Sequence, residues 1–398
     1  MNDLPLVSII TPSLNHARFI EATISSVLAQ DYPRIEYIVA DGGSTDGTLE
    51  ILRRYQDRLT WFSEPDRGQS DAINKGFRRA HGNILAWLNS DDTYLPGAVT
   101  AAVNHLIRHP DCAMVYGEGY LIDEAGRAKG RFPATEPFDL WKLVYVTDFI
   151  LQQTTFFRRD TLEAVGYLDE SLNWAMDWDL FIQIGKRFQV DYLPQYLANL
   201  REYQAAKTAS GGIPRLRELA RVMRRHGSRR YPPGIFGTYG IDTIMRLVWD
   251  PLEAVAPDIA KGPVKRARQL CEHVVYGVAG RMMRKANGRY ADGWLAGRAH
   301  FLLRKVPEAK QLLIRGRAPA RFQKGLGISA RINGHSLPKQ HVHADSDFEI
   351  LWDLRDCPSD DQALEIEVRP SLTFRPSRIP FTGDRRALSF QLRAIEIR

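Results

Sequence analysis

Short apolar runs and amphipathic segments alternate along the chain from its start to about Tyr203. The runs rich in β-branched and other apolar residues, which predict strands, are 6–11, 35–40, 59–63 and 84–88. The segments with apolar residues at helical spacing, which predict helices, are 20–28, 48–55, 71–80 and 98–107. Because strands that alternate with helices pair in parallel and are covered on both faces, we expect an α/β domain with a mostly parallel, Rossmann-like sheet.

The pattern changes twice after this domain. Residues 205–286 combine helical spacing with proline and glycine breaks and show no strand pattern. From about Asn287 onward, apolar residues alternate with a period of two, as in Phe348–Leu354, and turn pairs such as Asn333-Gly334 separate the runs. We therefore predict an α/β domain over 1–204, a helical segment over 205–286 and a small antiparallel β-sandwich over 287–398.

The chain carries a net charge of +7, but the positive excess is local. Residues 205–286 hold 16 Lys or Arg against 6 Asp or Glu, a net of +10, so the remainder is slightly acidic. A solvated helical face is the default interpretation of such a run. Nucleic-acid binding is disfavoured, because no recognition motif accompanies the charge. We favour docking on an anionic membrane surface, since the segment also has apolar faces and contains Trp249, Met282 and Met283.

The sequence predicts neither secretion nor membrane insertion. Polar Asn2 and Asp3 run directly into the first strand, without the basic and apolar regions of a signal peptide. No apolar run approaches the ~18 residues that a spanning helix needs. Cys112, Cys271 and Cys357 lie far apart, which fits buried thiols in a reducing compartment better than disulfides or a zinc site. We expect a cytoplasmic protein with at most a peripheral contact at the inner face of the membrane.

Acidic residues follow the predicted strands with unusual regularity. Asp41 closes the second strand, Glu64 and Asp66 follow the third, and Asn89-Ser90-Asp91-Asp92 follows the fourth. Ligands bind beyond the carboxyl ends of such strands. Since nucleotide phosphates are negative, an acidic pocket there suits them only with a divalent cation, and Mg²⁺ or Mn²⁺ prefers carboxylate and phosphate oxygens. Each motif alone would equally be an ordinary Asp-rich turn; their coincidence favours a site.

With these motifs in their order, the first ~200 residues resemble inverting family 2 glycosyltransferases, which have the A-type nucleotide-sugar-binding fold. The segments that carry the resemblance are Val7–Asn15, Asp41–Thr48, Asp66–Gly76, Trp87–Asp92 and Met176–Leu180.

The resemblance implies a role for each matching residue. It places Asp41 against the donor base and lines the same nucleotide pocket with Thr11, Pro12 and Asn15. It implies that Asp66 and the segment 68–74, including Asn74, also face the nucleotide or the rest of the donor. It makes Asp91 the principal metal ligand, with Asp92 near the donor sugar and Asn89 against the ribose. It makes Asp177 the general base.

Three positions depart from the family's pattern. Asn89 stands where the metal-binding motif usually begins with Asp, Met176 replaces the Glu that commonly precedes the base, and Tyr203 replaces the His of a downstream Arg-x-His pattern. These changes bear on metal affinity and on one phosphate contact. A helix N-cap is the alternative role for Asp177, and Asp179 is its rival as the base. Gln152 and Gln153 line the acceptor side or simply end a buried strand.

We therefore expect an enzyme that transfers a sugar, with inversion, from a nucleotide-sugar donor to a hydroxyl of a lipid-linked glycan acceptor in cell-surface polysaccharide synthesis. A nucleotidyltransferase or a dehydrogenase would need a glycine-rich loop after the first strand, and Thr11–His16 lacks one. The alternative from another class is a non-catalytic carbohydrate- or membrane-binding protein with a decayed transferase domain. Trp294 and Trp352 of the sandwich either stack on sugars or belong to its core.

Overall fold

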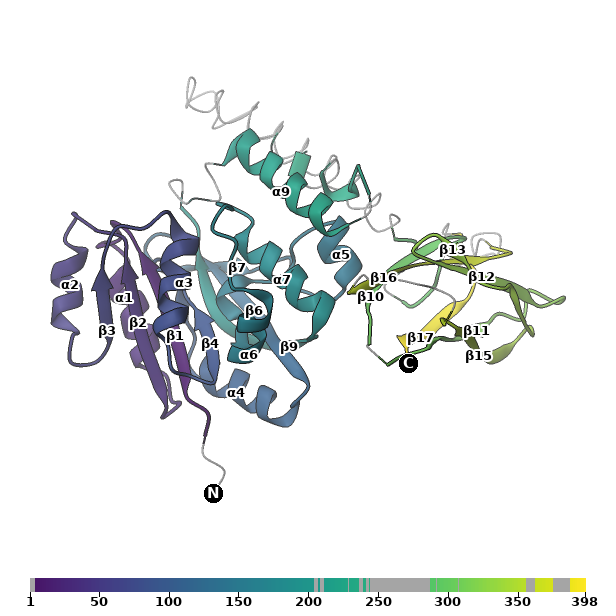
Figure 1. The fold of residues 1–398 in the computed structure, drawn as a ribbon, viewed down its shortest axis with the longest axis horizontal. Coiled ribbons are helices and arrows are strands. Elements are labelled where there is room, and N and C mark those ends of the chain that lie inside the picture. The colour runs from purple at the N-terminus through teal and green to yellow at the C-terminus, as the bar shows by residue number, and fades with distance from the viewer. Residues whose placement is uncertain are drawn as a thin grey trace. The chain divides into compact units, whose positions relative to one another are not determined.

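The computed structural model describes residues 4–203, 207, 211–227, 229–235, 239–240, 243, 287–290, 292–306, 308–355, 362–374 and 387–398 (Figure 1). The chain divides into two compact units, one of Met1–Phe138 with Asp148–His226 and one of Asp139–Thr147 with Gly227–Arg398. Most of the basic segment 205–286 lies outside the described residues, as do Cys271 and Cys357, so the membrane-docking hypothesis stays a prediction.

The first unit is built on one mixed sheet with the strand order β3-β2-β1-β4-β8-β6-β9-β5, and β7 pairs with β6. Its strands are β1 (Val7–Ser13), β2 (Ile35–Asp41), β3 (Thr60–Ser63), β4 (Ile84–Trp87), β5 (Thr93–Tyr94), β6 (Cys112–Ile122), β7 (Ala128–Arg131), β8 (Phe156–Arg158) and β9 (Gln189–Arg201). The strands β3, β2, β1 and β4 are parallel, as predicted. Beyond them β8 runs antiparallel to both β4 and β6, and β6 and β9 pair in parallel again.

The helices of this unit up to residue 108 fall where the apolar spacing predicts them. They are α1 (Ile20–Leu28), α2 (Thr48–Arg54), α3 (Gln69–Arg79), α4 (Ala98–Arg108), α6 (Arg159–Val165), α7 (Met176–Arg187) and α9 (Gly212–His226), with a 3₁₀ turn η1 (Gln152–Thr154). Helix α3 packs closely on β1, because a Cβ on Gly76 would lie 2.5 Å from Cγ2 of Ile10. This close approach brings the last turn of α3 directly against the middle of β1.

The parallel strands end together at one edge of the sheet. Ser13 of β1 is level with Asp41 of β2, which is level with Ser63 of β3. Strand β4 ends at Trp87, directly before the Asn89–Asp92 turn. The acidic motifs are therefore gathered at one edge, as parallel pairing predicts.

The second unit contains an antiparallel β-sandwich, which confirms this part of the predicted fold class. One sheet has the order β10-β16-β12-β13 with β14 on β12, and the other has the order β15-β11-β17. The elements are α5 (Leu140–Tyr145), β10 (Ala299–Arg304), β11 (Gln311–Ala318), β12 (Leu326–Ile332), β13 (His335–Ser336), β14 (Gln340–Val342), β15 (Ser346–Asp353), β16 (Ala363–Pro370) and β17 (Gln391–Ile397). Both sheets contribute to one apolar core, with Leu312 and Ile314 from one side and Phe301 and Ile366 from the other.

The two tryptophans considered for sugar stacking, Trp294 and Trp352, have different surroundings in the structure. Trp352 is buried in the sandwich core, where its Nε1 donates to the carbonyl of Pro338 at 2.7 Å. The alternative that it belongs to the core is therefore correct. Trp294 is half-buried and packs edge-on against Phe374. Among the described residues, no helix combines the length and apolar character that crossing a bilayer would require.

Candidate active site

The turn after β4 is organised around the buried carboxylate of Asp92, which is 1% exposed. Its Oδ1 accepts from the backbone N–H of Arg201 at 2.8 Å, and its Oδ2 accepts from Nε2 of Gln153 at 2.6 Å and Nδ2 of Asn89 at 3.2 Å. Burial, and next the negative charge of Asp91, raise the pKa of Asp92 to about 8. The end of β9 and the η1 turn are thus attached to the strand-end turn through one side chain.

Asp91 is half-buried and accessible beside this anchor. Its Oδ2 accepts from the Tyr203 hydroxyl at 2.8 Å. Burial, and next the charge of Asp91, raise the pKa of Tyr203, so the phenol stays a donor. Within the described part of the chain, Oδ1 of Asp91 accepts no hydrogen bond, and the Arg201 guanidinium is directed to the carbonyls of Asp91, Asp123 and Glu124 instead. Asp91 therefore has a carboxylate oxygen without a protein cation paired to it.

Asn89 lies within a chain of amide contacts. Its Oδ1 accepts from Nε2 of Gln69 at 2.8 Å, and its Nδ2 also donates to Oε1 of Gln152 at 3.3 Å. Nζ of Lys207 donates to Oε1 of Gln69 at 3.0 Å. Gln152 and Gln153, expected on the acceptor side or at a strand end, lie in η1 and contact the Asn89–Asp92 turn.

Asp41 holds the turn after β2. It is 1% exposed, and its Oδ2 accepts from the N–H groups of Gly43 and Ser44 and from the Ser63 hydroxyl at 2.6–3.0 Å. Its Oδ1 accepts from the Ser44 hydroxyl at 2.5 Å. Oδ2 thus accepts three hydrogen bonds and Oδ1 one among the described residues, so Oδ1 is the less engaged oxygen.

The other residues expected at the nucleotide pocket surround the same turn. Asn15 has a left-handed backbone with φ of 55°, and its Oδ1 accepts from Thr45 N at 2.8 Å. Oδ2 of Asp66 lies against Gly42, because a Cβ there would be 2.3 Å away. Thr11 and Pro12 are buried in β1, where the Thr11 hydroxyl is 3.1 Å from that of Tyr37.

Asn74 is oriented toward a neighbouring loop. It is 1% exposed, its Nδ2 donates to the Leu168 carbonyl and to Oε1 of Glu170, and its Oδ1 accepts from Leu168 N. Both N–H bonds are used within the protein. Any contact with a donor would therefore involve the remaining lone pair of Oδ1.

Asp177 is the second residue of α7. The helix begins at Met176 with Ala175 as its N-cap, so the alternative N-cap role for Asp177 is wrong. The carboxylate is half-buried and accepts from Trp178 N at 2.8 Å. Burial raises the pKa of Asp177, and burial together with the charge of Asp177 raises the pKa of Asp148. Two carboxyl groups therefore share one poorly solvated region.

Asp179, the rival base, has its oxygens engaged elsewhere. It is fully buried, and its Oδ1 accepts from Nε2 of His226 at 2.8 Å and pairs with Arg225 at 3.1 Å. Its Oδ2 accepts from Nε2 of Gln183 at 2.7 Å. This carboxylate holds α9 against α7.

Two residues of the site escaped the sequence analysis. Glu218 of α9 is 8% exposed, and its Oε1 accepts from the N–H groups of Asn173, Trp174 and Ala175 at 2.6–3.0 Å. It fixes the loop that leads into α7 and Asp177. Burial lowers the pKa of Lys207, against the charges of Asp177 and Glu218. No local motif marks either residue, because their partners lie far away in the sequence.

Comparison with known proteins assigns the family. Residues 8–166 match the family described as "Glycosyl transferase family 2". The chain is 32% identical over 184 residues to a "PGL/p-HBAD biosynthesis glycosyltransferase" of Mycobacterium bovis, a match that covers 45% of this chain and 69% of that protein. It is 30% identical over 210 residues to an uncharacterized glycosyltransferase of Rickettsia typhi, covering 51% of this chain and 66% of that protein. The chain belongs to glycosyltransferase family 2.

Solved structures share less sequence identity with this chain than these relatives do. A mannosyltransferase from Pyrobaculum calidifontis, in complex with GDP-Man and Mn²⁺, shares 21% identity and a TM-score of 0.47, covering 71% of this chain and 85% of that one. The chain spans 66% and 69% of the lengths of the two relatives named above.

The Glu218 contacts generate a first prediction. Glu218→Gln removes the negative charge and replaces Oε2, which accepts from Asn173 N at 3.0 Å, by an NH₂ group, so the variant should lose about 1–3 kcal/mol of unfolding free energy, in the range of a hydrogen bond to a charged group. Urea unfolding measures the loss, and hydrogen exchange should accelerate at the amides of 173–175. The control is Glu163→Gln, whose carboxylate is 53% exposed and 3.8 Å from Arg159. Equal stability of the two variants would contradict the assigned role.

Proposed function

We propose that the protein transfers a sugar from a nucleotide-sugar donor to a hydroxyl of a glycan acceptor, with inversion at the anomeric carbon. The observation that carries the proposal is the link between its two acidic groups. Lys207 donates to Gln69, Gln69 donates to Asn89 of the Asn89–Asp92 turn, and the charges of Lys207 and Asp177 interact. A base and a strand-end carboxylate pair are thus joined through one lysine and two amides.

Donor binding is assigned to the edge formed by the strand-end turns. We assign Thr11, Pro12, Asn15 and Asp41 to the nucleotide base and its surroundings, and Asp66, Asn74, Asn89 and Asp92 to the rest of the donor. Oδ1 of Asp41, which accepts one hydrogen bond within the turn, is the oxygen that we assign to an N–H of the nucleotide base. The carboxylate of Asp92 is enclosed by its hydrogen bonds, so we assign its contribution to donor binding mainly to its support of the turn.

The donor set at this turn fits a divalent cation. Asp91 offers an oxygen, Asn89 and Asp92 lie beside it, and the described residues place no protein cation on the Asp91 carboxylate. Oxygen ligands of this kind suit Mg²⁺ or Mn²⁺ held jointly with phosphates. When bound, such an ion would neutralise charge on the leaving diphosphate. Asp91 is assigned as its ligand from the protein.

Asp177 is assigned as the general base. It would accept the proton of the acceptor hydroxyl while the hydroxyl oxygen bonds to the anomeric carbon and the bond from that carbon to the diphosphate oxygen breaks. A single displacement of this kind inverts the carbon. The engagement of Asp179 with His226, Arg225 and Gln183 supports Asp177 as the base, since only the latter has a half-buried carboxylate.

The acceptor is proposed to be a lipid-linked glycan used in cell-surface polysaccharide synthesis. The printed name of the Mycobacterium bovis relative, which places that protein in PGL/p-HBAD biosynthesis, agrees with a glycolipid context. The basic segment 205–286 would dock such an enzyme at the inner face of the membrane, from the cytoplasm.

A donor screen tests the function. Purified protein with Mn²⁺ or Mg²⁺ should release nucleoside diphosphate from one of a set of UDP-, GDP- and dTDP-sugars, and the screen includes CMP-sugars. Asp91→Ala and Asp177→Ala should each lower turnover by at least about 100-fold, in the range usual for a lost general base or electrostatic group. Asp57→Ala, at an exposed turn, is the matched control and should be unaffected. Donor binding without metal-dependent turnover would favour the decayed, carbohydrate-binding alternative.

The environment of Asp177 predicts the pH dependence of turnover. Burial raises the pKa of Asp177, and a base acts only when deprotonated, so kcat should rise with pH through a midpoint above the ordinary Asp value of about 3.9. A pH series of initial rates at saturating donor measures this. In Asp177→Asn, the residual rate should no longer rise with pH through this midpoint. A midpoint at the ordinary pKa of Asp, or the same rise of the rate with pH in the variant, would count against Asp177 as the base.

A further inference from the structure

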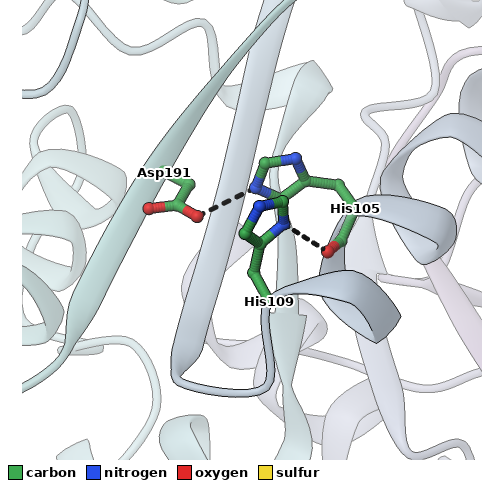
Figure 2. A group of neighbouring side chains, drawn as sticks. All are labelled: His105, His109 and Asp191. Carbon is green, nitrogen blue, oxygen red and sulfur yellow. Dashed lines mark hydrogen bonds and ion pairs between the residues drawn. The ribbon is translucent and has the colours of Figure 1, made fainter.

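His105, His109 and Asp191 form a compact cluster of metal-ligating side chains outside the proposed active site (Figure 2). Each offers a ligand atom, and these atoms all lie within 4.8 Å of one another. His105 and His109 come from the end of α4, one turn apart, and Asp191 comes from the start of β9. Nε2 of His105 is 2.9 Å from Oδ2 of Asp191, and the two rings stack with centroids 4.1 Å apart.

The hydrogen bonds of His109 leave its other nitrogen suited to a metal. Nδ1 of His109 is 2.9 Å from the backbone carbonyl of His105, and a carbonyl only accepts, so Nδ1 carries the proton. The neutral ring then has its lone pair on Nε2. Metal-ligating histidines commonly donate their second ring N–H to a carbonyl or carboxylate in this way. Figure 2 shows this ring beside that of His105, with its Nδ1 directed to the carbonyl.

The surrounding contacts hold the three ligands in place. Oδ1 of Asp191 accepts from Nε2 of Gln189 at 3.0 Å, which orients the carboxylate. Arg158 donates to the carbonyls of Leu106 and Cys112 at 2.7 Å, so the chain between α4 and β6 is braced on both sides of His109. The side chains of His105 and Asp191 are only 14% and 20% exposed. Contacts from neighbouring residues therefore hold the cluster in place between the end of α4 and the start of β9.

We propose that these three residues bind a transition-metal ion of the zinc class, through Nε2 of His105, Nε2 of His109 and Oδ2 of Asp191. Ligands about 2.0–2.1 Å from a tetrahedral zinc lie roughly 3.3 Å apart, so the ion would open the His105–Asp191 contact slightly and draw His109 inward. The ion takes the place of the proton between His105 and Asp191, and the neutral His105 ring then carries its proton on Nδ1. Water completes the coordination.

The site lies at the opposite end of β9 from the proposed active centre. Asp191 is near the start of the strand, and Arg201, which contacts Asp91 and Asp92, is its last residue. An ion here would join the end of α4 to β9 and stabilise the first unit by binding only the folded chain. It would take no part in sugar transfer.

The test uses Co²⁺ as a spectroscopic probe on the metal-stripped full chain. The background is Asp91→Asn, which removes the proposed ligand of the donor site. One equivalent of Co²⁺ should give the intense visible absorption of four-coordinate cobalt, Zn²⁺ should abolish it by competition, and Zn²⁺ should raise Tm. His109→Ala leaves the His105–Asp191 pair intact and should weaken Co²⁺ binding by at least about tenfold.

The control is His81→Ala, which removes an exposed histidine paired with Glu36 and should leave the cobalt signal unchanged. Circular dichroism verifies that each variant is folded. Absence of the four-coordinate spectrum in the parent chain would overturn the proposal. So would an undiminished spectrum in His109→Ala, because that would place the ion elsewhere, for example at His341 and His343 of the sandwich.

Discussion

The burial of Asp92 is the constraint on which the proposed active centre depends. A carboxylate removed from water is costly unless hydrogen bonds replace its solvation, and Asp92 obtains them from the Asn89 side chain, from Gln153 in η1 and from the Arg201 peptide group in β9. Those donors come from segments far apart in the sequence. One buried side chain therefore requires the end of β9 and the η1 turn to lie against the strand-end turn, and the geometry of the edge follows from that requirement.

Hydrogen bonds between distant segments also position Asp91 and Asp177, the two carboxylates proposed to act in catalysis. Because the Arg201 N–H is bound to Asp92, Tyr203 two residues later reaches Asp91 and donates to one of its oxygens. Glu218 gathers three consecutive N–H groups ahead of α7 and so places Asp177. The outcome is a half-buried Asp91 with an open oxygen and a half-buried Asp177 whose pKa is raised by burial. Asp92 and Glu218 therefore use their carboxylates to hold the structure together, whereas the carboxylates of Asp91 and Asp177 are the ones proposed to take part in the reaction.

Local pattern was enough to predict β1 to β4, the helices α1 to α4 and the common edge of those strands, because strand and helix periodicity and parallel pairing are local rules. It also predicted the sandwich, where Asn333 and Gly334 both have the positive φ of the expected turn. It could not predict that β8 would run antiparallel, nor the partners of Gln152, Gln153 and Asn74, which depend on packing between distant segments. The contacts of Glu218 and the addition of Asp191 to the His105–His109 pair also depend on packing between distant segments; only the two histidines, four residues apart at the end of α4, are related by spacing. The family pattern marks Tyr203 as a departure from the usual His, but its hydrogen bond to Asp91 follows only from the structure.

Metal binding at Asp91 tests the central claim most directly. Isothermal titration of Mn²⁺ into the His109→Ala chain, which lacks the second proposed site, should reveal about one equivalent, and UDP or GDP should tighten it by linkage. Asp91→Asn should weaken this binding by at least about tenfold, while Asp57→Asn leaves it unchanged. Equal Mn²⁺ affinity with and without the Asp91 carboxylate, in the presence of either nucleotide, would contradict the account.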